Sequence, residues 1–337
     1  MNPIVSIVIP VYNTALYLDE CMQSLLDQTY PKDSMEIIAI NDGSTDGSLD
    51  ILKSYEEKFP TFQIIDQENK GPGAARNVGI DLASGKYIYF LDSDDRIAPN
   101  LVTDCVKAIE KDFLEVCFFQ KYVFDDPDYS DKKPVPVLYQ TKNQKFGIQT
   151  GMDFFRIQID VDENCAAVWQ YFYRTSFLRK HNLYFPENML HEDEPFTVRL
   201  LLLAERFANL EKAFYFRRVR PGSIMTATNR LKRAEHYQHV LKVMNSYFSA
   251  LNSNQTILLS RYMVVILRNI LKLYRFNELW KNRSLLWKAA KMTNDRHVYK
   301  VPDCLGGLYM YTFCTYRAAR KFIGKKLSRL GSRLDNI

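Results

Sequence analysis

The chain has 337 residues, 47% apolar and 25% charged, which is typical of a globular protein with a sizeable core in one large or two ordinary domains. Its six cysteines form no CxxC pair and its first residues lack the pattern of a secretory signal, which argues against a zinc site, a disulfide framework and export, so we expect a cytoplasmic protein. The net charge of +6 comes from the C-terminal end, because residues 256–337 hold 17 Lys and Arg against 4 Asp and Glu.

The first half of the chain alternates predicted strands with predicted helices. Apolar runs at residues 5–11, 37–40, 62–65 and 87–91 indicate strands, and each is followed by a polar turn and a helical pattern. Such alternation gives a parallel sheet with right-handed crossovers, whose ligands bind beyond the carboxyl ends of the strands. We therefore expect the four polar turns to meet at one edge. They carry Tyr12 and Asn13, then Asp42, then Asn69 to Arg76, then Asp92 to Asp95.

The fourth predicted strand ends in three carboxylates within four residues, Asp92, Asp94 and Asp95. Clustered Asp side chains repel one another unless a cation joins them, and hard oxygen ligands suit Mg²⁺ or Mn²⁺ held with the help of substrate phosphates. The alternative is a polar turn whose side chains cap the next helix near Pro99. This run alone leaves both interpretations open.

Spacing argues against three other ligand-binding motifs. Residues Asp42 to Gly47 begin like an EF-hand loop, but Lys53 stands at the twelfth position, where Glu is required. Residues Gly71 to Arg76 imitate a dinucleotide fingerprint, but Arg replaces its last small residue and the segment follows the third strand rather than the first. A P-loop sequence is absent. We therefore expect neither a calcium loop nor a dehydrogenase.

After a helix at residues 101–109 and a strand at 114–119, the alternation stops. Residues 125–145 are rich in Asp, Pro and Lys, which indicates a long excursion to which we assign no role. Farther on, helical patterns dominate. The sequence thus predicts an α/β unit at residues 1–229 and a helical C-terminal region at 230–337.

A second acidic run, Glu192 to Glu194, stands directly before Pro195. Proline suits the first turn of a helix and carboxylates are favourable at its positive end, so these acids either stabilise a helix or take part in chemistry. A strand predicted at residues 214–220 leads into a Pro-Gly-Ser turn and gathers Arg217, Arg218 and Arg220.

The segment at residues 305–330 combines aromatic residues with a run of Lys and Arg. A basic amphipathic helix of this kind suits an anionic membrane interface, and the alternative is a solvated helix face. Nucleic acid is disfavoured as a partner, because no aromatic-interleaved binding motif accompanies the charge. We expect peripheral attachment at the inner face of the cell membrane.

With these pieces placed, residues 3–225 resemble the family 2 glycosyltransferases of the GT-A fold, the bacterial enzymes of capsule, exopolysaccharide and cell-surface glycan assembly. Six segments in matching order carry the resemblance: Ser6–Asn13, Asn41–Gly47, Asn69–Asn77, Phe90–Asp95, Glu192–Phe196 and Arg218–Ser223. Each is weak by itself, but their shared order and spacing are a strong signal. The resemblance implies a Rossmann-like, mostly parallel sheet flanked by helices.

The resemblance also implies an inverting, metal-dependent enzyme that moves a sugar from a nucleotide sugar, expected to be a UDP-sugar, to a hydroxyl of a glycan or lipid-linked oligosaccharide. Asp193 would be the general base, and Asp94 with Asp92 would hold Mn²⁺ or Mg²⁺. The donor-binding candidates are Pro10, Tyr12 and Asp42 around the base, Arg76 over the base and diphosphate, Asp92 against the ribose, and Asn13, Gly73, Ser93, Asp94 and Arg220. The acceptor-binding candidates are Trp169 and Glu192.

Several alternatives stay open at this point. Glu192 and Glu194 flank Asp193, so the sequence does not decide which carboxylate is the base. Trp169 either forms a sugar platform with Tyr171 or packs in the core, and Arg220 either neutralises the diphosphate or forms a salt bridge. The alternative function is a transferase-like partner or activator subunit without turnover. The helical C-terminal region is expected to dock a lipid-linked acceptor, to form a homodimer, or both.

Overall fold

The computed structural model describes residues 4–126, 137–139, 147–161, 163, 166–220 and 229–273. The chain divides into two compact units, Met1–Thr228 and Asn229–Ile337. Their boundary lies one residue from the one expected from the sequence. Three predicted segments lie outside the described residues: most of the 125–145 excursion, the Pro221–Ser223 turn and the basic 305–330 segment.

Four parallel strands form the first half of the sheet, in the spatial order β3-β2-β1-β4. They are β1 (Val5–Val11), β2 (Met35–Asp42), β3 (Phe62–Gln67) and β4 (Tyr87–Phe90). Ile7 in β1 stands opposite Ile37 and Tyr89 of its two neighbours, and all three side chains are fully buried. Strands covered on both faces read as largely apolar runs, as β1, β2 and β4 do, whereas β3 at the edge of the sheet is at most partly buried.

The second half of the sheet is mixed, with the order β9-β6-β10-β5 beyond β4. These strands are β5 (Arg96–Ile97), β6 (Val116–Asp125), β9 (Tyr171–Arg174) and β10 (Phe207–Val219), and β7 (Val137–Tyr139) and β8 (Gly147–Gln149) pair with β6 and β10. β9 runs antiparallel to both β4 and β6. β10 begins seven residues before the predicted start at residue 214, and its pairing register shifts between Asn209 and Tyr215.

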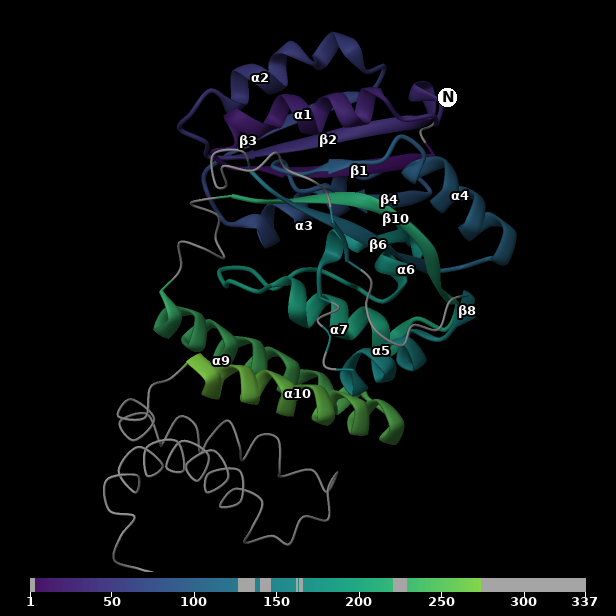
Figure 1. Ribbon diagram of the computed structural model, residues 1–337, viewed down its shortest axis with the longest axis vertical. Helices are drawn as coiled ribbons and strands as arrows, with labels where there is room; N and C mark the ends of the chain where they lie inside the picture. The colour runs from purple at the N-terminus through teal and green to yellow at the C-terminus, as the bar shows by residue number, and fades with distance from the viewer. Residues whose placement is uncertain are drawn as a thin grey trace, which may run out of the picture. The chain divides into compact units, whose positions relative to one another are not determined.

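Helices cover both faces of this sheet, as Figure 1 shows for α1 and α2 on one side of β1 and α3 on the other. The helices of this unit are α1 (Ala15–Leu26), α2 (Ser48–Ser54), α3 (Pro72–Leu82), α4 (Leu101–Asp112), α5 (Gly151–Asp160), α6 (Thr175–Lys180) and α7 (Asp193–Leu203), with 3₁₀ turns η1 (Lys32–Ser34), η2 (Glu56–Lys58) and η3 (Val168–Gln170). α5, which was not expected from the sequence, packs against α7.

Side chains of β1 alternate between two cores. Ile7 and Ile9 pack with residues of α1, α2 and α4 in one buried cluster. Val8 points to the other face, where Gly79 lets α3 approach closely, since a Cβ at Gly79 would lie 2.2 Å from Val8 Cγ1. Close helix packing at a glycine fixes α3 against β1.

The second face of the sheet carries an aromatic cluster. The Phe90 ring packs edge-on against Phe185, Phe196 and Tyr173. Phe185 and Phe196 stack on each other with ring centroids 3.9 Å apart. This cluster fixes the start of α7 below the end of β4, which places the two acidic runs of the sequence near each other.

A buried carboxylate closes the amino edge of the parallel strands. Glu36 of β2, which is 1% exposed, accepts hydrogen bonds from the hydroxyl of Ser6 in β1 and from the Ser84 and Gly85 backbone N–H groups at 2.6 and 3.0 Å. The Ser84 hydroxyl donates a further bond at 2.9 Å. One side chain thus joins β1, β2 and the turn before β4.

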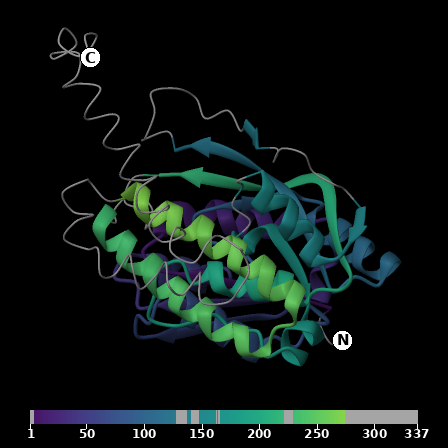
Figure 2. The ribbon, with the colours of Figure 1, turned by 90° about the horizontal axis from the view of Figure 1, so that it is seen from below.

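The described part of the second unit, residues 229–273, is a helical hairpin. α9 (Arg230–Tyr247) and α10 (Ser253–Leu273) lie side by side (Figures 1 and 2) and are joined through the 3₁₀ turn η4 (Phe248–Ala250). Arg230 at the start of α9 donates to the Leu273 carbonyl at the end of α10 (2.8 Å), so the two helices are antiparallel. In the part of the chain that the structure describes, no helix is long and apolar enough to span a bilayer.

Candidate active site

The polar turns after β1, β2 and β4 lie together at the carboxyl edge of the sheet. The Asn13 side chain accepts a hydrogen bond from Thr45 N (2.8 Å), which ties the turn after β1 to the turn after β2. The Thr14 hydroxyl donates to Ser93 Oγ (2.9 Å), which ties the same turn to the acidic run after β4. Asn13 has a positive φ of 50°, a conformation that Asn tolerates better than most residues. Asn13 and Ser93 therefore hold the rim together.

The residues expected around a nucleobase differ in accessibility. Tyr12 is 49% exposed, so its ring is available for stacking. Pro10 is partly buried in β1, opposite Ile40 of β2. Asp42 is only 2% exposed, and its oxygens accept from the backbone N–H groups of Lys70 (2.9 Å) and Gly71 (2.8 Å) and from the Gln67 side chain (2.7 Å). Asp42 thus fixes the loop that starts α3.

The three carboxylates after β4 occupy different environments. The Asp92 side chain is 27% exposed and pairs with Arg76 at 2.8 Å, while that of Asp94 is 22% exposed and pairs with Arg220 Nε at 2.7 Å. Asp95 is 5% exposed and accepts hydrogen bonds from the Tyr215 hydroxyl and from Arg218 N, both at 2.6 Å. Burial, and then the charges of Asp94 and Asp92, raise the pKa of Asp95 well above its usual range. Asp92 and Asp94 therefore open to solvent, whereas Asp95 anchors β10.

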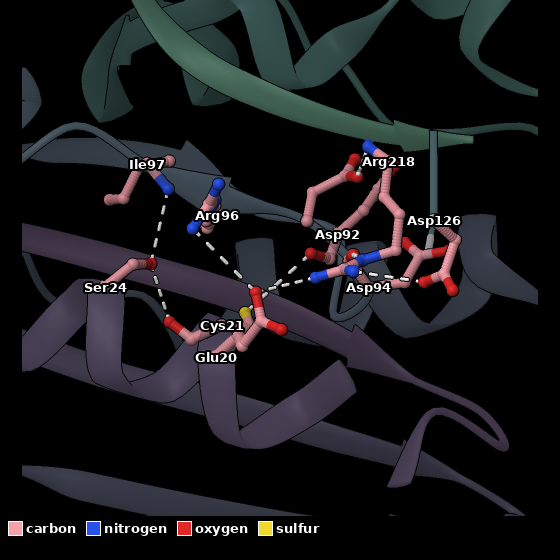
Figure 3. Close-up of polar contacts among 10 residues, drawn as sticks. Glu20, Cys21, Ser24, Asp92, Asp94, Arg96, Ile97, Asp126 and Arg218 are labelled. Carbon is pink, nitrogen blue, oxygen red and sulfur yellow. Dashed lines mark hydrogen bonds and ion pairs between the residues drawn. The ribbon is translucent and has the colours of Figure 1, made fainter. Parts of the chain in front are cut away.

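Arg218 ties four segments together beneath this run (Figure 3). Its side chain, 5% exposed, forms ion pairs with Glu20 of α1 at 2.8 Å and with Asp126 after β6 at 3.1 Å. Its Nε donates to the Asp94 carbonyl oxygen at 3.1 Å. The sequence indicated an arginine cluster here but not Glu20 or Asp126. A buried guanidinium requires countercharges, yet nothing in the chain marks which distant acids supply them.

The second acidic run lies at the start of α7. Glu192, 7% exposed, pairs with Arg76 Nη1 at 2.7 Å. Asp193 keeps some exposure, and its carboxylate accepts from Glu194 N at 3.0 Å. Burial, and then the charges of Glu192 and Glu194, raise the pKa of Asp193 well above its usual range, against the lowering effect of Arg76. A carboxylate of this kind suits a general base.

Arg76 joins the two acidic runs. Its guanidinium contacts Asp92 on one side and Glu192 on the other. Although burial lowers the pKa of Arg76, these two carboxylates raise it above its usual value, so the guanidinium stays charged. Gly73, one helical turn earlier on α3, approaches the same segment, since a Cβ at Gly73 would lie 3.0 Å from Glu192 Cγ. The two acidic runs therefore share one edge of the sheet.

Trp169 lies in the interior. It is 8% exposed and its ring stacks on Tyr215 with centroids 4.1 Å apart, while Tyr171 is fully buried. The sequence left open whether these aromatic residues form a sugar platform or pack in the core, and the structure gives them core positions. Lys121 lies beside Trp169, 5.1 Å from its ring, and burial together with the charge of Arg217 lowers the pKa of Lys121 to about 8.

The carboxylates at the rim do not form a complete metal site by themselves. Within the described residues, no group of three or more His, Cys, Asp or Glu side chains is arranged to hold a metal ion. Mg²⁺ usually takes only one or two protein carboxylates and completes its shell with water and substrate phosphates. Asp92 and Asp94, both partly exposed, fit an ion that a diphosphate helps to hold.

A mixed sheet with helices on both faces and carboxylates at its carboxyl edge is the architecture of the GT-A class of folds. Two solved structures share this fold. The crystal structure of Staphylococcus aureus TarS residues 1–349 in complex with UDP-GlcNAc matches with a TM-score of 0.67 and 24% identity over 86% of this chain and 80% of that one. The mannosyltransferase PcManGT from Pyrobaculum calidifontis, in complex with GDP-Man and Mn²⁺, matches with a TM-score of 0.55 and 14% identity over 96% of this chain and 83% of that one.

Sequence comparison narrows the class to a family. The model of the glycosyl transferase family 2 domain matches residues 6–172. The chain is also 31% identical over 241 residues to the uncharacterized glycosyltransferase YibD of Escherichia coli (strain K12), which covers 71% of this chain and 68% of that protein. The chain therefore belongs to glycosyl transferase family 2. It is a glycosyltransferase with the GT-A fold, as the sequence motifs predicted.

Proposed function

We propose that this glycosyltransferase is inverting and metal-dependent and moves a sugar from a nucleotide sugar, a UDP-sugar, to a hydroxyl of a glycan or lipid-linked oligosaccharide. The observation that carries the proposal is the Arg76 bridge, which brings Asp92 and Glu192, the neighbour of Asp193, to one guanidinium. The similar TarS structure is a complex with UDP-GlcNAc, which supports a UDP-sugar donor here.

The donor would lie along the rim formed by the turns after β1, β2 and β4. The exposed ring of Tyr12 would stack on the base, next to Pro10 and the loop fixed by Asp42. Asp92 would contact the ribose. Arg220 already neutralises one carboxylate, Asp94, and its guanidinium would extend that neutralisation to the diphosphate. Asn13 and Ser93 would keep the turns in register for this contact.

Asp94 and Asp92 would hold the divalent cation, Mn²⁺ or Mg²⁺. Bound there, such an ion supplies positive charge to the diphosphate as the bond to the sugar breaks. The PcManGT structure is a complex with GDP-Man and Mn²⁺, which is consistent with this proposal. The arginines at the rim add to the same electrostatic stabilisation of the leaving group.

Asp193 would take the proton from the acceptor hydroxyl. Glu192 is already paired with Arg76, and Glu194 is 3% exposed. Asp193 is partly exposed and has a raised pKa. Attack from the face opposite the leaving group inverts the anomeric centre, so an α-linked donor gives a β-linked product. A relative with 28% identity over 66% of this chain is named poly(ribitol-phosphate) beta-N-acetylglucosaminyltransferase TarS, and that name specifies a β product.

The Asp193→Asn variant tests this assignment. Loss of a general base lowers a rate by about 10²–10⁴-fold, so we expect the transfer rate to fall by that factor while calorimetry shows UDP affinity within about twofold of wild type. Glu205→Gln, which changes an exposed carboxylate after the other end of α7, is the control and should transfer normally. A normal transfer rate in Asp193→Asn would show that the base is elsewhere.

The donor itself is identified by a thermal-shift series of nucleotide sugars with Mn²⁺. The true donor should give the largest increase in the unfolding midpoint, because binding to the native state stabilises it by mass action. The same protein should hydrolyse that sugar nucleotide slowly. Binding without any hydrolysis or transfer would favour the alternative of a partner subunit without turnover.

Peripheral attachment to the inner face of the membrane is a further part of the proposal. It rests on the basic sequence at residues 305–330, which lies outside the described residues. Co-flotation of the full chain with anionic vesicles, but not with neutral ones, is the expected result. Equal flotation with both would contradict it.

A further inference from the structure

One face of α3 is occupied by the loop that leads to Asp193. We call residues Phe185–Glu192 the base loop. Gly73, Arg76 and Asn77 are spaced i, i+3 and i+4 on α3, so they share one side of the helix. Each of the three contacts the base loop.

Asn77 makes the most specific of these contacts. Its side-chain carbonyl accepts a hydrogen bond from Phe185 N (2.8 Å), and its amide donates to the Phe185 carbonyl oxygen (2.9 Å). The amide also lies 3.2 Å from a carboxylate oxygen of Glu187. Asn77 is 8% exposed, so it satisfies both backbone groups of Phe185 away from water. Buried backbone groups with no partner are costly, so this side chain fixes the backbone at the start of the loop.

Gly73 and Arg76 hold the other parts of the loop. A Cβ at Gly73 would lie 2.9 Å from the Pro186 carbonyl oxygen, so only glycine allows the loop to pack this closely. Arg76 binds Glu192, the residue directly before Asp193, at 2.7 Å. Within the loop, Asn188 and His191 have positive φ, 58° and 61°, a conformation that Asn and His adopt more often than most residues.

The contacts to Phe185 extend to α7 itself. The Phe185 ring stacks on Phe196, which stands one turn after Asp193. α3 is in turn packed tightly on β1 at Gly79. A side chain on α3 that fixes Phe185 therefore also fixes the first turn of α7, which carries Asp193.

We infer that this side of α3 is a clamp on the base loop and that Asn77 is a positioning residue for the transfer reaction, acting through Asp193. The inference rests on the proposed role of Asp193 as the base. It gives Gly73 and Arg76, for which the resemblance implies donor contacts, a second role in holding the base loop. Arg76, bound to Asp92 at its other end, places the base loop and the donor side of the site in one rigid frame.

The test compares Asn77→Ala with Asp81→Asn. Asp81 lies on the same helix and accepts a hydrogen bond from the Tyr184 hydroxyl (2.5 Å), directly before the base loop, but this contact is exposed. A misplacement of about 1 Å costs about 10²-fold in rate, so we expect kcat for Asn77→Ala to fall about 10- to 100-fold. UDP affinity by calorimetry should stay within about twofold, and Asp81→Asn should keep the wild-type kcat.

A double-mutant cycle separates positioning from general destabilisation. If Asn77 acts through Asp193, then adding Asn77→Ala to Asp193→Asn should lower the remaining rate by less than about twofold. Gly73→Ala, which pushes the base loop away from α3, should behave in the same way and serves as the second variant if Asn77→Ala does not fold.

Three results would overturn the inference. One is that Asn77→Ala and Gly73→Ala keep the wild-type kcat per folded molecule while their unfolding midpoints fall, which would mean that these residues serve stability alone. Another is a loss of UDP affinity that matches the loss of kcat, which would make this face of α3 a donor contact. The third is full additivity in the cycle. If Asp193→Asn itself transfers normally, the proposed role of Asp193 as the base is wrong. The Asp193→Asn single variant of the cycle reveals this case independently of Asn77.

Discussion

The two edges of the parallel strands each hold carboxylates, but in different ways. At the amino edge, Glu36 is 1% exposed, and among the described residues its hydrogen-bond donors are the uncharged hydroxyl and N–H groups of Ser6, Ser84 and Gly85. At the carboxyl edge, the side chains of Asp92 and Asp94 are 27% and 22% exposed and pair with arginines. The Glu36 carboxylate is therefore shielded from solvent, whereas Asp92 and Asp94 are accessible to a ligand.

The difference follows from what each partner can do. Backbone N–H groups and short hydroxyl side chains are held in place by the strands and turns, so they cannot release Glu36 without breaking the fold. An arginine reaches its partner through a long side chain, and its guanidinium binds carboxylate and phosphate in the same geometry. We therefore interpret Glu36, whose oxygens are bound by fixed neutral donors, as a structural carboxylate. Asp92 and Asp94, in partly exposed ion pairs, are available for chemistry.

The Asp94→Ala variant tests the carboxyl edge and should have the largest effect. We expect transfer in the presence of Mn²⁺ to fall by about 10²–10³-fold, because the cation that Asp94 would hold stabilises the leaving diphosphate by several kcal/mol. The free energy of unfolding in urea should change by no more than about 1 kcal/mol, since partly exposed ion pairs contribute little to stability. A large loss of stability with normal transfer per folded molecule would reverse the comparison.

The Glu36→Ala variant tests the amino edge. Buried donors left without an acceptor cost about 1–3 kcal/mol each, partly relieved by relaxation, so we expect the free energy of unfolding to fall by about 2–4 kcal/mol. The kcat of the folded fraction should be unchanged. Glu57→Ala, at an exposed position in η2, is the control and should alter neither quantity. A lowered kcat with full stability would show that this edge also serves the reaction.

The burial of each strand explains how much of the fold the sequence revealed. Strands β1, β2 and β4 were predicted because they are buried on both faces and read as largely apolar runs. Strand β3, at the edge of the sheet and at most partly buried, was predicted from its apolar residues at 62–65. The second half was only partly predicted. β10 carries Glu211 and Lys212 where its register shifts, so its apolar pattern breaks there, and β5 has only two residues. The pairing of β9 between β4 and β6 joins strands distant in the chain, and local patterns do not encode it.

The site was predicted to a similar extent. The resemblance implied that Asp92 and Asp193 belong to one active site, and Arg76 joins their loops through ion pairs with Asp92 and with Glu192, the residue before Asp193. The sequence did not reveal that Asp42 is saturated by the loop before α3, or that Glu20 balances Arg218. These partners are chosen by packing, so a residue type and its spacing along the chain carry no signal for them.

The smallest predicted effect concerns the pH dependence of transfer in Glu192→Gln. A carboxylate base works only when ionised, so the acid side of the pH profile of kcat follows the pKa of Asp193. Burial raises that pKa first, the charges of Glu192 and Glu194 raise it further, and Arg76 lowers it. Gln at position 192 removes one negative charge and leaves Arg76 less neutralised. Both changes lower the pKa, so the acid side of the profile should move to lower pH.

The quantity to compare is the pH at which kcat falls on the acid side, the acid limb of the profile, measured at saturating donor and acceptor. The maximal kcat is not a suitable measure, because the loss of the Arg76 ion pair also lowers it. Glu205→Gln controls for removal of a surface charge and should leave the limb in place. A limb that stays fixed or moves to higher pH in Glu192→Gln would mean that Asp193 does not set it. Glu36→Gln extends the comparison to the amino edge: its carboxylate is bound by neutral donors far from the base, so it should lower stability and leave the limb unmoved. A substitution that shifts the pH profile at the carboxyl edge, together with one at the amino edge that does not, would distinguish a carboxylate that affects the reaction from one that stabilises the fold.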